Sequence, residues 1–67
     1  MAKQMLRDRR GRILGWTEDG VAGKLNIRDW QGRLLGWYDT RRDTTHDKQG
    51  RLVGRGNLLT TLLPPRP

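Results

Sequence analysis

The chain has 67 residues, no cysteine and a formal net charge of +7, from 14 basic and 7 acidic residues. A chain of this length forms one domain at most, and no disulfide can stabilise it. A structural metal is disfavoured because His46 is the sole good nitrogen ligand, so oligomerisation is the expected source of extra stability. Because only 33% of the residues are hydrophobic, the aromatic residues are expected to supply much of the core. These are Trp16, Trp30, Trp37 and Tyr38.

The hydropathy pattern disfavours membrane insertion and secretion. No run of more than two apolar residues occurs, so the sequence offers neither a membrane span nor the core of a signal peptide. The absence of cysteine agrees with a reducing compartment. We therefore expect a soluble, cytoplasmic protein.

One pattern is repeated in residues 7–16, 28–37 and 46–55. In each copy an Asp is followed three residues later by Gly, then by Arg, two branched aliphatic residues, another Gly and a large side chain. An Asp can begin a type I turn, and the first Gly accepts the positive φ of a hairpin with a bulge. Residues 20–25 look like a degenerate copy, with Lys24 in the place of the Arg. The pattern predicts a turn followed by a strand in each copy.

Turns near residues 8, 20, 29, 39 and 47 divide the chain into about six short strands. In the third of these, Leu25 and Ile27 alternate with polar residues and are expected to face a buried side. The β-branched pair in residues 44–46 suits an edge strand. We predict an all-β domain, a meander of about six short strands from repeated hairpins. It is expected to be barrel-like or pseudo-symmetric, because many short strands curl or pair to hide their edges.

The end of the chain has a different periodicity. Residues 58–63 read Leu-Leu-Thr-Thr-Leu-Leu, which is a helical spacing, and Asn57 can cap the first turn. Two prolines then stop the segment. We predict one or two helical turns that close one mouth of the sheet, with a final strand as the alternative. The domain is expected to span residues 1–63, followed by a disordered tail at 64–67.

Three glycines fall inside predicted strands, where glycine lowers stability and needs a reason. They are Gly15, Gly36 and Gly54. The favoured interpretation is that the missing Cβ lets a Trp ring or a neighbouring backbone come close in a tightly curved sheet. The alternative is that the backbone of a ligand approaches at these positions.

The repeats resemble the tyrosine-aspartate repeats of large bacterial shell toxins, in which an aromatic-Asp pair leads through two residues to Gly-Arg-Leu. The similarity lies in residues 28–34, residues 46–52 and the pair Tyr38-Asp39. The length and cadence are also similar to the small bacterial four-fold beta flower domains, whose hairpins surround a pseudo-symmetry axis. Two departures are that Arg or His replaces the Tyr of the pair, and that the repeats are too few for a shell. The resemblance covers residues 7–55 and implies a repeated all-β architecture in a bacterial protein, with no active site carried over.

Catalytic chemistry has little to draw on, and we expect a protein that is not an enzyme and holds no metal or cofactor. His46 is the only imidazole, and it aligns with Arg7 and Arg28 of the other copies, which indicates a surface position rather than a general base. The repeated aspartates could form a carboxylate cluster for a cation, but a role as turn caps is favoured. They are Asp8, Asp29 and Asp47.

The charge indicates a polyanionic partner, since 11 of the 14 basic residues are Arg, whose planar fork suits phosphate. Paired strands are expected to array four equivalent cations for phosphate contacts, Arg12, Lys24, Arg33 and Arg51, with loop arginines extending the patch. Trp30, in the middle of a turn, could stack on a base, fold over the sheet edge or make a subunit contact. The predicted binding residues are Arg9, Arg10, Arg12, Lys24, Arg33, Arg41, Arg42, Arg51 and Trp30. We expect a homo-oligomeric accessory or regulatory module that binds DNA or RNA, or alternatively an assembly module that docks on an acidic protein.

Overall fold

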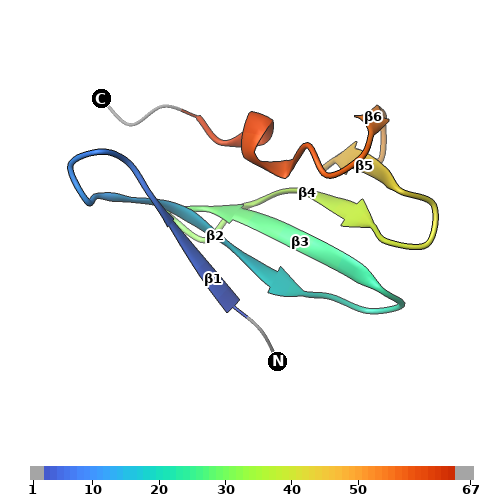
Figure 1. The fold of residues 1–67 in the computed structure, drawn as a ribbon, viewed down its shortest axis with the longest axis horizontal. Coiled ribbons are helices and arrows are strands. Elements are labelled where there is room, and N and C mark those ends of the chain that lie inside the picture. The colour runs from blue at the N-terminus through green and yellow to red at the C-terminus, as the bar shows by residue number, and fades with distance from the viewer. Residues whose placement is uncertain (1–2, 65–67) are drawn as a thin grey trace.

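The structure is a computed structural model, and it describes residues 3–64. Six strands and one short 3-10 helix follow one another along the chain (Figure 1). They are β1 (Lys3–Arg7), β2 (Ile13–Asp19), β3 (Lys24–Asp29), β4 (Leu34–Asp39), β5 (Thr44–Asp47), β6 (Leu52–Arg55) and the 3-10 helix η1 (Leu59–Leu62). Residues 65–67, which make up most of the expected disordered tail, lie outside the described residues.

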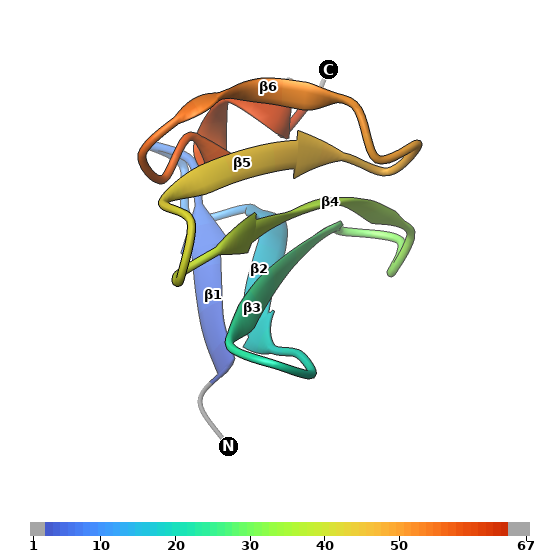
Figure 2. The ribbon, with the colours of Figure 1, turned by 90° about the vertical axis from the view of Figure 1, so that its right-hand side faces the viewer.

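The strands form one antiparallel sheet in the order β1-β2-β3-β4-β5-β6, which confirms the predicted all-β meander. The sheet is strongly twisted, so that β1 and β6 run steeply across each other (Figure 2). It is open rather than closed into a barrel, because β1 and β6 each pair with a single neighbour. The prediction of an edge strand at residues 44–46 is wrong, since β5 lies between β4 and β6 and Thr45 is fully buried.

Three hairpins carry the sequence repeat: β1-β2, β3-β4 and β5-β6. In each, the pairing shifts by one residue near the turn, so that one aliphatic residue of the second strand is bulged out of register. The glycine of each turn has a positive φ, between 82° and 89°, as a hairpin with a bulge requires. The degenerate copy at 20–25 folds differently, as a two-residue turn with positive φ at Ala22 and Gly23.

One face of the sheet is packed against the C-terminal segment, residues 57–63, which crosses above it in Figure 1. We call this the covered face. Its paired residues are Leu6 with Gly15, Ile27 with Gly36, and Thr45 with Gly54. A Cβ at each of these strand glycines would collide with a leucine of the segment: Leu63 at Gly15, Leu62 at Gly36 and Leu58 at Gly54. The packing interpretation of the glycines is therefore confirmed, although the close groups are leucines and strand carbonyls rather than Trp rings.

The core lies between the covered face and the C-terminal segment. Within residues 3–64 the fully buried apolar side chains are Ile27 and Leu59. The prediction that the aromatic residues supply much of the core is wrong, because Trp16 and Trp37 are only half-buried and Trp30 is 42% exposed. Alternation explains the exposure of Trp16 and Trp37, because each follows a covered-face glycine and so points to the other face of the sheet, whereas Trp30 lies in a turn.

Hydrogen bonds hold the C-terminal segment on the sheet. The Thr45 hydroxyl donates to the Gly56 carbonyl (2.6 Å) and accepts from the Leu58 amide (3.0 Å). The Asn57 side chain accepts from the amide of Leu59 (3.1 Å), the first residue of η1, but Leu58 rather than Asn57 holds the N-cap position. The helical prediction is thus right in kind, with one 3-10 turn that lies over the covered face.

Candidate nucleic-acid interface

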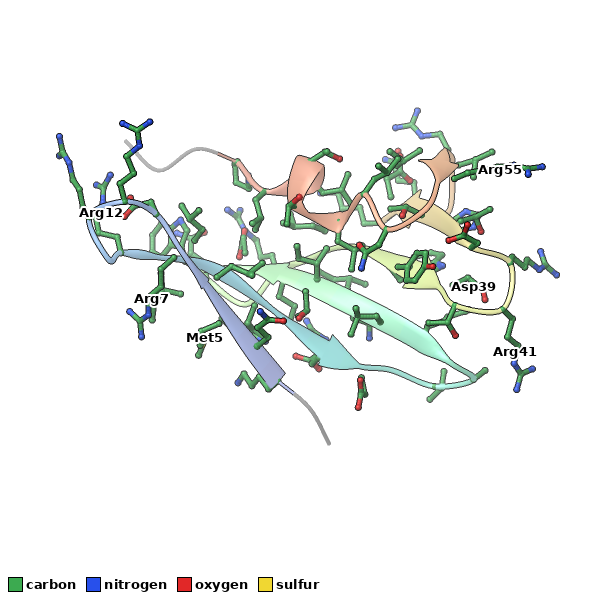
Figure 3. All side chains as sticks on the ribbon, viewed as in Figure 1. Met5, Arg7, Arg12, Asp39, Arg41 and Arg55 are labelled. Atoms are coloured by element: carbon green, nitrogen blue, oxygen red, sulfur yellow. The ribbon has the colours of Figure 1, made fainter. Side chains whose placement is uncertain are left out.

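The repeated turns lie at one end of the sheet, because alternate connections of an antiparallel meander lie at the same end of the strands, although the twist of the sheet spreads them apart (Figure 2). We call this the repeat end, formed by residues 8–12, 29–33 and 47–51. Figure 3 shows Arg12 at one extreme of the long axis, and Arg41 and Arg55 at the other. Lys24 begins β3 at the opposite end from the repeat arginines. The expected array of four equivalent cations is therefore wrong for Lys24 and consists of three arginines.

Those three arginines are held in the same way. In each repeat the Arg Nε donates to the Oδ2 atom of the Asp four residues earlier. The distances are 2.9 Å for Arg12 with Asp8, 2.9 Å for Arg33 with Asp29 and 3.1 Å for Arg51 with Asp47. The arginine side chains remain exposed, by 36% for Arg12, 73% for Arg33 and 75% for Arg51. The ion pair therefore orients each guanidinium while leaving the Arg33 and Arg51 side chains largely in solvent.

The aspartates act as turn caps. Asp29 Oδ1 accepts from the amides of Gln31 and Arg33, both at 2.9 Å, while its backbone carbonyl accepts from the Gly32 amide. Burial raises the pKa of Asp29, but hydrogen bonds from Arg33 and the Gln31 amide outweigh it, so the pKa falls below its ordinary 3.8. Equivalent hydrogen bonds within their own turns lower the pKa values of Asp8 and Asp47. No group of three potential metal ligands occurs within residues 3–64, and each aspartate serves its own turn.

The repeat end has a positive balance of charge. Residues 8–12, 29–33 and 47–51 together contain six basic and three acidic side chains. Arg9, Arg10 and Lys48 are exposed in the turns. Trp30 is also exposed there, by 42%, in the turn between β3 and β4. Of the predicted binding residues, Arg9, Arg10, Arg12, Trp30, Arg33 and Arg51 thus lie in the turns at the repeat end of the sheet.

The remaining predicted residues, Lys24, Arg41 and Arg42, meet at a cleft of about 450 Å³. Its lining also includes Trp37 and His46, whose rings stack with centroids 5.8 Å apart and an interplanar angle of 23°. His46 is half-buried, so the expected surface position holds only in part. Trp37 was expected among the aromatic residues of the core. The alternation of Gly36 with Trp37 was the signal that places this indole on the opposite face from the core.

That opposite face, which we call the open face, carries a second aromatic-basic group. Trp16 Nε1 donates to Glu18 (2.8 Å), which also pairs with Arg28 (3.2 Å), and Lys3 Nζ lies 4.7 Å from the Trp16 ring centroid. Arg28 in turn donates to the Gly32 carbonyl (3.0 Å). Arg7 makes the equivalent bond to the Gly11 carbonyl (2.9 Å) in the first repeat. Arg7 and Arg28 thus stabilise the turns that follow their strands.

Comparison of the chain with protein-family models, curated proteins and solved structures found no match. Within residues 3–64, no helix is long and apolar enough to cross a membrane.

Proposed function

We propose that this protein is a non-enzymatic β-module that binds DNA or RNA mainly through phosphate contacts, in an accessory or regulatory role. The observation that supports the proposal best is the repeated arginine at one end of the sheet. Arg12, Arg33 and Arg51 are each oriented by an aspartate through Nε. Three similarly held guanidinium groups at one end suit a polymer with regularly spaced phosphates.

The ion pair with aspartate favours phosphate binding by these arginines and does not prevent it. A guanidinium has five donors in a fixed fork, and the bond to aspartate occupies the Nε edge. The outer nitrogens can then contact a phosphate with less loss of side-chain freedom than a mobile arginine would suffer. The six basic side chains of the repeat end exceed its three acidic ones, so a phosphate meets a net positive surface.

Labelled single-stranded and double-stranded DNA and RNA, titrated with the protein and followed by fluorescence anisotropy, test the proposal. We expect binding at about 50 mM salt that weakens by orders of magnitude at about 200 mM, because each phosphate contact releases counterions. Failure of every oligonucleotide to bind at the lower salt would overturn the proposal. Binding that hardly changes with salt would also contradict it and would favour a packed protein interface.

A pair of variants in one strand and its turn localises the contact. Arg51→Gln and Arg55→Gln remove the same charge from exposed positions at the two ends of β6. We expect Arg51→Gln to weaken binding and to reduce the salt slope by about 1, with Arg55→Gln close to the parent chain. Equal effects of the two variants would show that net charge, rather than the repeat end, governs binding.

We further propose that the protein works as a homo-oligomer. The supporting observation is that exposed apolar side chains lie on the two edge strands: Met5 (44%) on β1, and Leu52 (63%) and Val53 (40%) on β6. Pairing of edges between subunits would cover them. Sedimentation velocity should give a mass that is a multiple of 7.8 kDa. Leu52→Lys should dissociate the oligomer, whereas Val21→Lys, which lies in a turn, should not. A parent chain that sediments as a monomer would refute the proposed oligomer.

A further inference from the structure

The cleft on the open face combines an aromatic wall with a basic end. It extends from Gly50, past Trp37 and His46, to the arginines of the turn between β4 and β5. Its volume of about 450 Å³ lies in the range of small-ligand sites. This size and shape suit one unit of a polymer rather than a double helix.

The aromatic wall is built by cross-strand pairing. Trp37 of β4 and His46 of β5 are directly opposite each other in the sheet, and their rings stack. Lys24 of β3 places Nζ 5.5 Å from the Trp37 ring centroid, and the far edge of the indole lies against Gly50. A flat ring can stack against such an aromatic wall, because every nucleobase presents a π face.

The basic end of the cleft lies on the turn between β4 and β5, which hydrogen bonds attach to the turn between β2 and β3. The Thr40 hydroxyl and amide both donate to the Gly23 carbonyl, at 2.6 and 3.2 Å, which ties the turn to its neighbour. Asp39, the only carboxylate in the lining, accepts from the backbone amides of Arg41 (3.0 Å) and Arg42 (3.3 Å). The carboxylate thus caps the turn from which both arginines project. Figure 3 shows Arg41 pointing outward from this end of the molecule.

We propose that this cleft binds one nucleotide of a single-stranded nucleic acid. Its base stacks at Trp37 and His46, and its phosphate contacts Lys24, Arg41 and Arg42. The inference rests on the proposed function and narrows its substrate class, because the bases of a duplex are paired and stacked inside the helix and cannot enter. Binding at the repeat end requires only phosphates, whereas binding in the cleft also requires an unpaired base.

The test compares three probes with the same number of phosphates: a single-stranded 12-nucleotide DNA, a 12-nucleotide hairpin duplex closed by a non-nucleotide linker, and an abasic strand of equal length. We expect the single strand to bind about 10-fold more tightly than the abasic strand, because stacking of one base contributes about that factor. The duplex should resemble the abasic strand at equal charge. Equal affinity for all three probes, with the steep salt dependence retained, would overturn the cleft proposal and leave the proposed function standing.

Two matched variants assign the preference to the cleft. Trp37→Leu should reduce affinity for the single strand about 10-fold and leave affinity for the abasic strand unchanged. Trp16→Leu changes the same repeat position outside the cleft lining and should keep the preference. If Trp16→Leu abolishes the preference and Trp37→Leu retains it, the site is wrongly placed and the proposal fails.

A fluorescence measurement leaves Trp37 intact and so does not depend on the folding of Trp37→Leu. A chain with Trp16→Phe and Trp30→Phe has Trp37 as its only indole. The single strand should quench its emission, whereas the abasic strand should not. Binding of the single strand without quenching would overturn the cleft proposal alone. Absence of binding by every probe at about 50 mM salt would overturn the proposed function, and the cleft proposal with it.

Discussion

The side chain of Leu62 occupies the space next to Gly36 where any larger residue of β4 would place its side chain. A Cβ at Gly36 would lie 2.7 Å from Leu62 Cδ1 and would also collide with the carbonyl oxygen of His46 on β5. The sheet and the C-terminal segment can approach this closely only because the strand residue lacks a side chain. The leucine-rich C-terminal segment thus covers one face of the open meander, as a second sheet does in a β-sandwich.

Gly36→Ala should lower the free energy of unfolding by about 1–3 kcal/mol, because the added methyl overpacks the contact and pushes against a strand carbonyl. Gly54→Ala is the matched control, since its Cβ would meet only the flexible end of Leu58, at 2.7 Å. Urea denaturation followed by circular dichroism measures both. Equal losses of unfolding free energy in the two variants would show that the collision with the His46 carbonyl does not add to the destabilisation.

Asp29→Ala should destabilise the fold more than Asp47→Ala. Both side chains accept two backbone amides and one Arg Nε, but Asp29 is only 2% exposed. Removing a buried acceptor leaves its donors without a partner, which costs about 1–3 kcal/mol at Asp29. Water can replace the carboxylate at the more exposed Asp47. Thermal unfolding of the two variants provides the comparison, and a larger effect at Asp47 would contradict the argument.

The free energy of unfolding should decrease at acidic pH. The pKa values of Asp8, Asp29 and Asp47 lie below their ordinary 3.8, so the folded state favours the ionised carboxylates. The stabilisation is therefore complete above the unfolded-state pKa and is lost as pH falls through the lower folded-state pKa values. We expect the urea midpoint to be nearly constant from about pH 7 to 5 and to decrease between about pH 4 and 2.

Asp29→Asn is the control for this titration, because the amide does not ionise in that range. Its acid-dependent loss of stability should be smaller than that of the parent chain, although it starts from a lower stability at pH 7. If both chains lose the same free energy of unfolding on acidification, Asp29 does not contribute to the pH dependence.

Thr45→Val should loosen the C-terminal segment while preserving the volume of the side chain. The substitution removes the hydroxyl that bonds to the Gly56 carbonyl and the Leu58 amide, at a cost of about 1–3 kcal/mol for the groups left without a partner. Hydrogen exchange should then accelerate in residues 57–63. Thr44→Val, next to it on β5, should leave exchange there unchanged; acceleration by both variants would mean that β5 itself is disturbed.

Much of the fold could be predicted because the turn chemistry is local. The residues from Asp29 to Arg33 contain most of the donors and acceptors of their turn, and the adjacent Arg28 supplies one more, so the same hydrogen bonds recur wherever Asp, Gly and Arg recur at this spacing. The meander and the capping role of Asp follow from that. The degenerate copy misled the prediction, because Gly20 cannot act as the side-chain acceptor and the chain forms a two-residue turn instead.

By itself, the sequence determined the turns, the strand count, the basic surface and the helical character of the segment after Asn57. The tertiary structure alone decided that Lys24 lies away from Arg33, that the sheet stays open, and that Trp37 and His46 form a cleft wall. These features depend on contacts between residues far apart in the chain. Antiparallel pairing alternates the strand ends, and the docking of the C-terminal leucines on the glycine face selects the side of the sheet that is buried.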